Sequence, residues 1–175
     1  VRFYGHHEKS QMPPFLLEYL QETFTLGKMK ALWRGPGEAE YPIVLYGEGY
    51  GAKIQKGGGA YTSQTKGGGV SFRLFDVLVG AVPTADIKGV WLRRADVEDV
   101  AAKLGIKTVP LLRTEAYLNE VVVMAKHPPL ISSVAYEEGT EGHPAEGIVA
   151  FTAEPLYNNR GQRLMFKLKT EDFAK

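Results

Sequence analysis

Residues 71–79 read Ser-Phe-Arg-Leu-Phe-Asp-Val-Leu-Val, a run rich in aromatic and branched side chains. These residue types favour extended backbone, so the segment predicts a β-strand with apolar side chains facing a core. Upstream, the continuous apolar run at residues 43–46 predicts a second strand. We expect that strand to end in the glycine-rich segment Gly-Glu-Gly-Tyr-Gly at residues 47–51.

Helical periodicity occurs at three places along the chain. Apolar residues recur at helical spacing from the Pro13-Pro14 pair to Phe24. Residues 95–104 predict an amphipathic helix that ends at Gly105, because glycine tolerates the left-handed backbone of a helix C-terminus. A third helix is expected over residues 115–126, ahead of a Pro-Pro pair.

The remaining strand predictions set the fold class. Residues 106–112 predict a strand, and residues 146–151 and 164–169 predict a strand pair joined through a turn-rich segment. Residues 1–4 are also strand-like. Strands and helices do not alternate regularly, so we predict an α+β fold of mostly antiparallel sheets with flanking helices.

Composition excludes several classes of protein. The 175 residues fit one domain, and 21 basic against 20 acidic side chains give a net charge of +1. That balance excludes a polycation or an acidic tail. The absence of cysteine excludes disulfides, cysteine-ligated zinc and thiol nucleophiles. No apolar run approaches the roughly 20 residues of a membrane helix, so we expect a cytoplasmic protein.

Three segments carry candidate functional residues. Glu48, framed by glycines, suits a ligand hydroxyl or a metal ion, because glycines allow close backbone approach; a plain glycine turn is the alternative. One aromatic of residues 72–77 suits stacking on a base, whereas the other interpretation is a core strand. Glu146 suits a metal ligand or an exposed strand end.

Lys167 and Lys169 form the fourth candidate. On a strand, residues two apart share a face, so the two ammonium groups repel unless anions lie beside them. A bound phosphate supplies such anions. The alternative is an edge strand whose lysines prevent aggregation.

The order of these segments resembles a known superfamily. GEGYG, FRLFDV, EGIV and FKLKT follow one another as motifs III, IIIa, IV and V do in the covalent nucleotidyltransferases, which include ATP-dependent RNA and DNA ligases and capping enzymes. The most similar group is the adenylation domain of phage-type RNA ligases, and the resemblance covers about residues 1–173. It implies the nucleotidyltransferase fold, with an ATP pocket between two antiparallel sheets.

The resemblance also implies roles for single residues. Glu48 matches the acid that contacts the nucleotide sugar or supports the metal, and Phe75 matches the aromatic that stacks on adenine. Glu146 matches an acid that binds the divalent metal. Lys167 and Lys169 match lysines that contact and activate the nucleotide phosphates. The implied activity is adenylyl transfer and RNA strand sealing with ATP and magnesium on RNA ends or a nicked duplex, in the host cell if the protein is phage-encoded.

Two departures from the family pattern bear on activity. No lysine is followed by x-Asp-Gly, the motif that carries the family's nucleophile, so we expect a single domain over residues 1–175 that is N-terminally incomplete relative to the family. His6 stands where relatives carry an arginine, which makes it a candidate nucleotide contact. The imidazole of histidine is mostly neutral near pH 7, and it cannot form the two parallel hydrogen bonds to phosphate that an arginine guanidinium forms.

These departures leave an alternative function open. The chain is then a catalytically inactive or engineered remnant that binds ATP or RNA ends, or a scaffold for a new activity. Other nucleotide and hydrolase motifs fail: Ala52 breaks a G-x-G-x-x-G pattern, and neither a Walker sequence nor a G-x-S-x-G elbow occurs. The four histidines have no zinc-site spacing.

Overall fold

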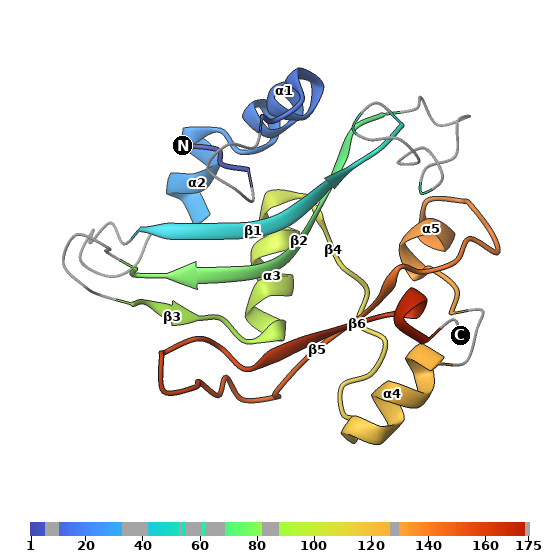
Figure 1. Ribbon diagram of the computed structural model, residues 1–175. Helices are drawn as coiled ribbons and strands as arrows, with labels where there is room; N and C mark the ends of the chain where they lie inside the picture. The colour runs from blue at the N-terminus through green and yellow to red at the C-terminus, as the bar shows by residue number, and fades with distance from the viewer. Residues whose placement is uncertain are drawn as a thin grey trace. The chain divides into compact units, whose positions relative to one another are not determined.

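The computed structural model describes residues 1–5, 11–32, 42–52, 54, 61, 69–81, 88–126 and 130–173 (Figure 1). The chain divides into two compact units, Val1–Val109 and Pro110–Lys175, and each has its own sheet and core. A compact unit is not by itself a domain, so one domain over residues 1–175 stays a prediction. The α+β class with mainly antiparallel strands is confirmed.

The first unit is organised around its second strand. This strand, β2, has the predicted bounds Ser71–Val79 and pairs antiparallel along its length with β1. Its other edge is shared, since β3 pairs antiparallel with its last residues and β4 pairs parallel with its first half. The partner strands are β1 (Ile43–Tyr50), β3 (Val90–Trp91) and β4 (Lys107–Thr108).

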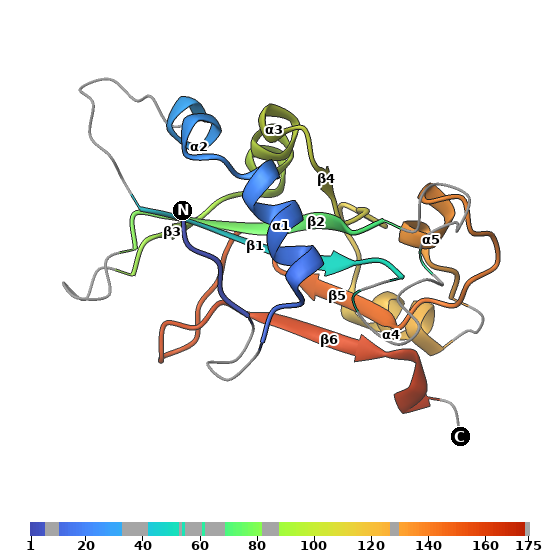
Figure 2. The same ribbon diagram turned by 90° about the horizontal axis from the view of Figure 1, so that it is seen from above.

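Three helices bury one face of this sheet. They are α1 (Pro14–Thr23), α2 (Leu26–Leu32) and α3 (Arg94–Leu104), and Figure 2 shows α2 and α3 on the same side of the sheet. As predicted, α3 ends at Gly105, whose φ of 70° is left-handed. The core joins the helices to β2 through Leu16, Leu20, Phe24, Phe72, Leu74, Val77, Val97, Val100, Ala101 and Leu104.

Strand β1 does not end at Tyr46 as expected; it continues through the glycines to Tyr50. A Cβ on Gly47 would overlap the Phe72 ring and lie 2.6 Å from the backbone oxygen of Arg73. A Cβ on Gly49 would lie 2.5 Å from the Leu16 side chain. The two glycines therefore make room for core side chains on the helix-covered face, and the segment is part of a strand and not a turn.

The second unit is a two-stranded sheet packed on a helix. Strands β5 (Gly147–Phe151) and β6 (Met165–Lys169) pair antiparallel, and both start within one residue of the predicted positions. Helix α4 (Leu118–Lys126) covers one face through Val121 and Ala125, which pack on Ile148. The unit also contains α5 (Ser133–Glu137) and the 3₁₀-helix η4 (Thr170–Phe173).

Other predictions fail for identifiable reasons. Residues 1–4 form no strand; Phe3 packs against the first core without ladder hydrogen bonds. The strand predicted over residues 106–112 shrinks to β4 because Pro110 has no N–H to donate to a ladder. Helix α4 begins at Leu118 rather than at residue 115. At that start the Glu120 carboxylate accepts a 2.7 Å hydrogen bond from the backbone N–H of Tyr117.

The sequence did not indicate α2, α5 or β3. All three are short, and β3 has only two residues, so none extends far enough to display a periodicity. In the part of the chain that the structure describes, no helix combines the length and apolarity needed to span a membrane.

Gly47→Ala tests the packing of β1 against β2. The added Cβ must displace the buried Phe72 ring or the β2 backbone, so we expect the free energy of unfolding to fall by about 1–3 kcal/mol. Gly27→Ala in α2 is the matched control, because nothing lies within 4 Å of its Cβ. Urea denaturation of both variants makes the comparison; equal stabilities would contradict the packing role of Gly47.

Candidate functional site

Lys167 and Lys169 lie on one face of β6, directed away from α4. The register places Lys167 opposite Val149 and Lys169 opposite Gly147. The intervening pair, Ile148 and Leu168, faces the other way and packs in the core on α4. Side chains alternate along a strand, so both ammonium groups project from the face that α4 leaves uncovered.

Each of these lysines is paired with a carboxylate. Lys167 Nζ lies 3.2 Å from Glu146 Oε1, and Lys169 Nζ lies 2.8 Å from Glu171 Oε1. The hydrogen bond to Glu171, followed by its charge, raises the pKa of Lys169, and the same hydrogen bond lowers the pKa of Glu171. Lys169 therefore stays protonated at neutral pH. The two carboxylates offset the repulsion between the lysines, which shows that this face accepts negatively charged oxygen atoms.

The backbone around Glu146 is fixed to the end of β6. The carbonyl oxygen of Glu146 accepts hydrogen bonds from the N–H of Thr170 (3.0 Å) and from its hydroxyl group (3.2 Å). A Cβ at Gly147 would overlap the carbonyl oxygen of Leu168. Glycine at this position lets β5 approach β6 closely, and the exposed Glu146 carboxylate is thereby held within reach of Lys167.

Phe75 lies at a β-bulge in the first unit. The β1–β2 register passes from the Tyr46–Asp76 pair to the Gly47–Leu74 pair, so Phe75 has no partner on β1. Its side chain is 39% exposed, while the other side chains of residues 72–78 are buried. Bulges turn a side chain out of the regular alternation and often occur beside active sites. The bulge thus presents an aromatic ring outside the helix-covered core.

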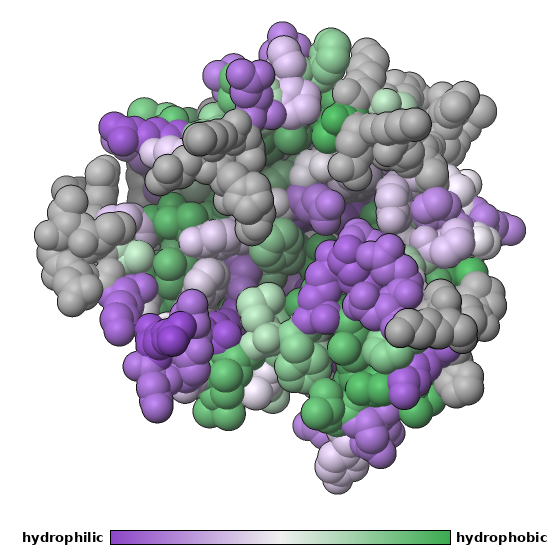
Figure 3. Space-filling model, viewed as in Figure 1, coloured by the Kyte–Doolittle hydropathy of each residue, from purple (hydrophilic) through white to green (hydrophobic). Residues whose placement is uncertain are grey.

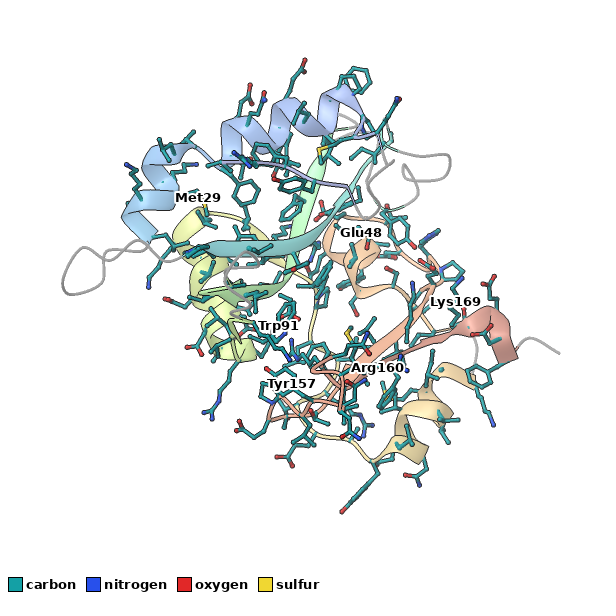
Figure 4. All side chains as sticks on the ribbon, turned by 60° about the vertical axis from the view of Figure 1, so that its left-hand side comes forward. Met29, Glu48, Trp91, Tyr157, Arg160 and Lys169 are labelled. Atoms are coloured by element: carbon teal, nitrogen blue, oxygen red, sulfur yellow. The ribbon has the colours of Figure 1, made fainter. Side chains whose placement is uncertain are left out.

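Glu48 lies directly opposite Arg73 in the β1–β2 pair, and its side chain is exposed (Figure 4). Directly opposed residues share a face. Arg73 is only 2% exposed and donates two 3.1 Å hydrogen bonds, one to the Tyr50 hydroxyl and one to the Thr108 carbonyl. The face of this sheet opposite the helices therefore places the exposed Glu48 carboxylate beside a buried, hydrogen-bonded cation.

The structure divides the candidate residues into two groups. Glu48 and Phe75 belong to the sheet of the first unit, whereas Glu146, Lys167 and Lys169 come together in the second. The proposed nucleotide contact at His6 lies outside the described residues.

Magnesium is held by oxygen atoms, which the exposed carboxylates of the described residues can supply. Among the residues described, no three side chains of histidine, aspartate or glutamate gather as a metal site. Magnesium usually keeps several waters and takes one or two carboxylates plus substrate phosphates. An exposed single carboxylate such as Glu146, beside a face that accepts phosphate-like oxygens, fits that mode of binding.

One residue of this region, Arg73, was not among the candidate residues predicted from the sequence. Arg73, like the buried Asp76, is a charged residue in a mostly apolar strand, and a charged residue in a buried strand must find polar partners. The charged residue is visible in the FRLFDV segment, but the segment was interpreted from its aromatic and apolar residues alone. Arg73 fixes Tyr50 and β4 on the face that carries Glu48.

Comparison with known proteins identifies a family over most of the chain. A family model described as RNA ligase matches residues 6–169, a span that includes all six candidate residues. No curated protein and no solved structure gives a significant match.

Alanine substitution of the two phenylalanines of β2 tests whether one ring is part of the core and the other is exposed. Phe72→Ala removes a buried ring and is expected to lower the free energy of unfolding by about 3–5 kcal/mol. Phe75→Ala removes an exposed ring at the bulge and is expected to lower it by less than about 1 kcal/mol. Urea denaturation measures both. Equal losses would mean that Phe75 is part of the core and is not available to a ligand.

Proposed function

Because the chain belongs to the RNA ligase family, we propose that its site is built for RNA sealing by adenylyl transfer, with ATP and magnesium, in a phage-type nucleotidyltransferase fold. This chain lacks the family's nucleophile motif, so the step that we propose it retains is the joining of RNA that already carries the adenylate. The family implies a nucleic-acid substrate. The observation that carries the proposal is the β6 face, where two lysines on one side of a strand are each balanced by a carboxylate. A nucleotide phosphate replaces those carboxylates as the anion.

Lys167 and Lys169 act on the phosphates in this proposal. Charge builds up on phosphate oxygens as the adenylyl group moves, and fixed cations beside those oxygens lower the barrier. Lys169 is suited to this role because a lysine ammonium group is charged at neutral pH and its partner, Glu171, is an exposed carboxylate that a phosphate can replace. Glu146 would hold the magnesium ion through its exposed carboxylate, and Lys167 would then contact the phosphates. Magnesium supplies further neutralisation of the phosphate charge.

Phe75 and Glu48, both in the first unit, keep in this proposal the nucleoside-binding roles that the family resemblance implies. An exposed aromatic ring stacks on a purine by the contact that single-strand binding proteins use with bases. A carboxylate accepts hydrogen bonds from the two hydroxyl groups of ribose, and Glu48 is exposed for that purpose. Arg73 holds the strand beneath it through Tyr50.

A second candidate function follows from one observation in the sequence. None of the lysines is followed by x-Asp-Gly, the pattern of the family's nucleophile. The chain is then a remnant or engineered scaffold that binds ATP or RNA ends without charging itself with AMP. Sealing of RNA that already carries the 5′-adenylate does not need that lysine, so this reaction distinguishes a working site from an inactive one.

Two measurements on the 175-residue chain test the proposal. We expect no AMP adduct in the intact mass after incubation with ATP and magnesium, because the nucleophile motif is absent. We expect the same protein to join a pre-adenylated RNA to a 3′-hydroxyl. No joining by folded protein would reject the ligase proposal and favour the remnant. An AMP adduct would show that a different lysine acts as nucleophile.

Lysine substitutions locate the chemistry. Lys167→Ala and Lys169→Ala are each expected to lower the rate of joining of pre-adenylated RNA by about 10²-fold or more, since each removes a fixed charge from the reacting phosphates. Lys103→Ala is the matched control, because Lys103 is also exposed and paired with a carboxylate, Asp99, but lies on α3. Equal rates of joining in all three variants would show that the β6 face takes no part in the reaction.

A further inference from the structure

The β5–β6 hairpin carries four basic side chains and no acid over its second half, after Glu154. Residues 155–170 read PLYNNRGQRLMFKLKT and contain Arg160, Arg163, Lys167 and Lys169 without a single acid. The whole chain is nearly balanced, with 21 basic and 20 acidic side chains. The four cations of this segment are therefore a local cluster of basic side chains, of the kind that binds a polyanion when the anion replaces the Glu146 and Glu171 carboxylates beside Lys167 and Lys169.

Arg163 lies on the same face as the two lysines. Its guanidinium carbon is 4.8 Å from the centre of the Phe151 ring. Phe151 pairs with Met165, and alternation along β5 and β6 puts these two residues on the face of Lys167 and Lys169. Successive same-face residues of a strand are about 7 Å apart, and Met165 lies between Lys167 and Arg163, so Arg163 extends the face by about 14 Å beyond Lys167. The aromatic ring beneath it restrains the arginine side chain.

The tip of the hairpin is fixed by its own hydrogen bonds. The side-chain oxygen of Asn158 accepts from the backbone N–H groups of Arg160 (2.9 Å) and Gln162 (3.0 Å), and its amide donates to Gln162 Oε1 (2.9 Å). Gly161 has a φ of 72°, which completes the turn. Arg160 thus projects from a preorganised loop, and little conformational entropy is lost when it binds a ligand.

An exposed aromatic ring accompanies these arginines. Tyr157 is 46% exposed and forms an isolated β-bridge with Arg163 at the base of the turn. Figure 4 shows Tyr157 and Arg160 at the hairpin, and Figure 3 shows hydrophilic side chains at its tip. Arginine recognises phosphate through paired hydrogen bonds, and an exposed aromatic ring stacks on an unpaired base. The combination of both groups fits a single nucleic-acid strand better than a free anion.

We propose that the basic face, defined as Arg160, Arg163, Lys167 and Lys169, binds the phosphate backbone of a single-stranded RNA end, and that Tyr157 stacks on one of its bases. The inference rests on the proposed function, because it takes Lys167 and Lys169 as the end of the face where the reacting phosphates lie. Arg160 and Arg163 are the residues that extend the site along the RNA. They bind the strand at a distance from the reacting phosphates and do not take part in adenylyl transfer.

Fluorescence anisotropy with a labelled, 5′-phosphorylated single-stranded RNA of about 12 nucleotides tests this inference. Arg160→Gln combined with Arg163→Gln is expected to weaken binding at least tenfold at low salt. The slope of log affinity against log salt is expected to fall by about 0.7 for each phosphate contact removed. Arg113→Gln is the control, since it removes one positive charge, half of what the double variant removes, from an exposed arginine of the same unit that is paired with Glu120.

Three further variants distinguish loss of binding from loss of folding and test the stacking contact. Arg160→Gln alone changes only the exposed tip and is expected to reduce the salt slope without altering the melting temperature. Arg163→Lys retains the positive charge over Phe151 and is expected to bind RNA more tightly than Arg163→Gln. Tyr157→Ala is expected to weaken binding with an unchanged salt slope, because stacking releases no counterions.

The outcomes separate the inference from the proposed function. If wild-type protein binds RNA and the double arginine variant binds it with the same affinity and salt slope, the proposed role of the basic face is wrong, and the proposed function is unaffected. Folded wild-type protein that binds no RNA at all overturns the proposed function, and the basic face with it. Losses of the same size in the double variant and in Arg113→Gln show a general charge effect and also overturn the inference.

Discussion

The alternation of side chains between the two faces of a strand is the constraint on which both units depend. In β2 the alternation gives Phe72 and Leu74 to the helix-covered core, and the bulge at Phe75 then shifts it so that Val77 also faces inward. Without the bulge, the odd-numbered Val77 and the even-numbered Leu74 would face opposite sides. The irregularity is therefore what keeps the core continuous, and the exposed ring of Phe75 is its consequence.

The same constraint acts without interruption in β6, where it creates an electrostatic problem. Packing of Leu168 on α4 forces Lys167 and Lys169 onto a shared face. Two ammonium groups on one face repel each other, and Glu146 and Glu171 offset that repulsion. Both ion pairs are solvent-exposed, so they stabilise the fold little. A face that is held together by weak, exchangeable anion contacts is suited to exchange those anions for phosphates.

Local patterns in the sequence predicted much of the fold, and nonlocal contacts explain the rest. Residues 71–79 and the pair β5–β6 were predicted because their composition and turn residues act over a few positions. The bulge at Phe75 depends on the register with β1, and the glycines at 47 and 49 serve side chains from β2 and α1. Neither is visible in the segment itself. The shared face of Lys167 and Lys169 needed only their spacing, whereas their carboxylate partners needed the folded chain.

The most direct test of the account follows the lysine side chains by NMR while ATP and magnesium are added to protein with isotope-labelled lysines. The account predicts that the signals of Lys167 and Lys169 shift as the nucleotide phosphates displace Glu146 and Glu171. The signal of Lys103, whose ion pair with Asp99 lies on α3, should stay in place. Saturation with ATP that leaves the Lys167 and Lys169 signals unmoved would contradict the assignment of this face to phosphate binding.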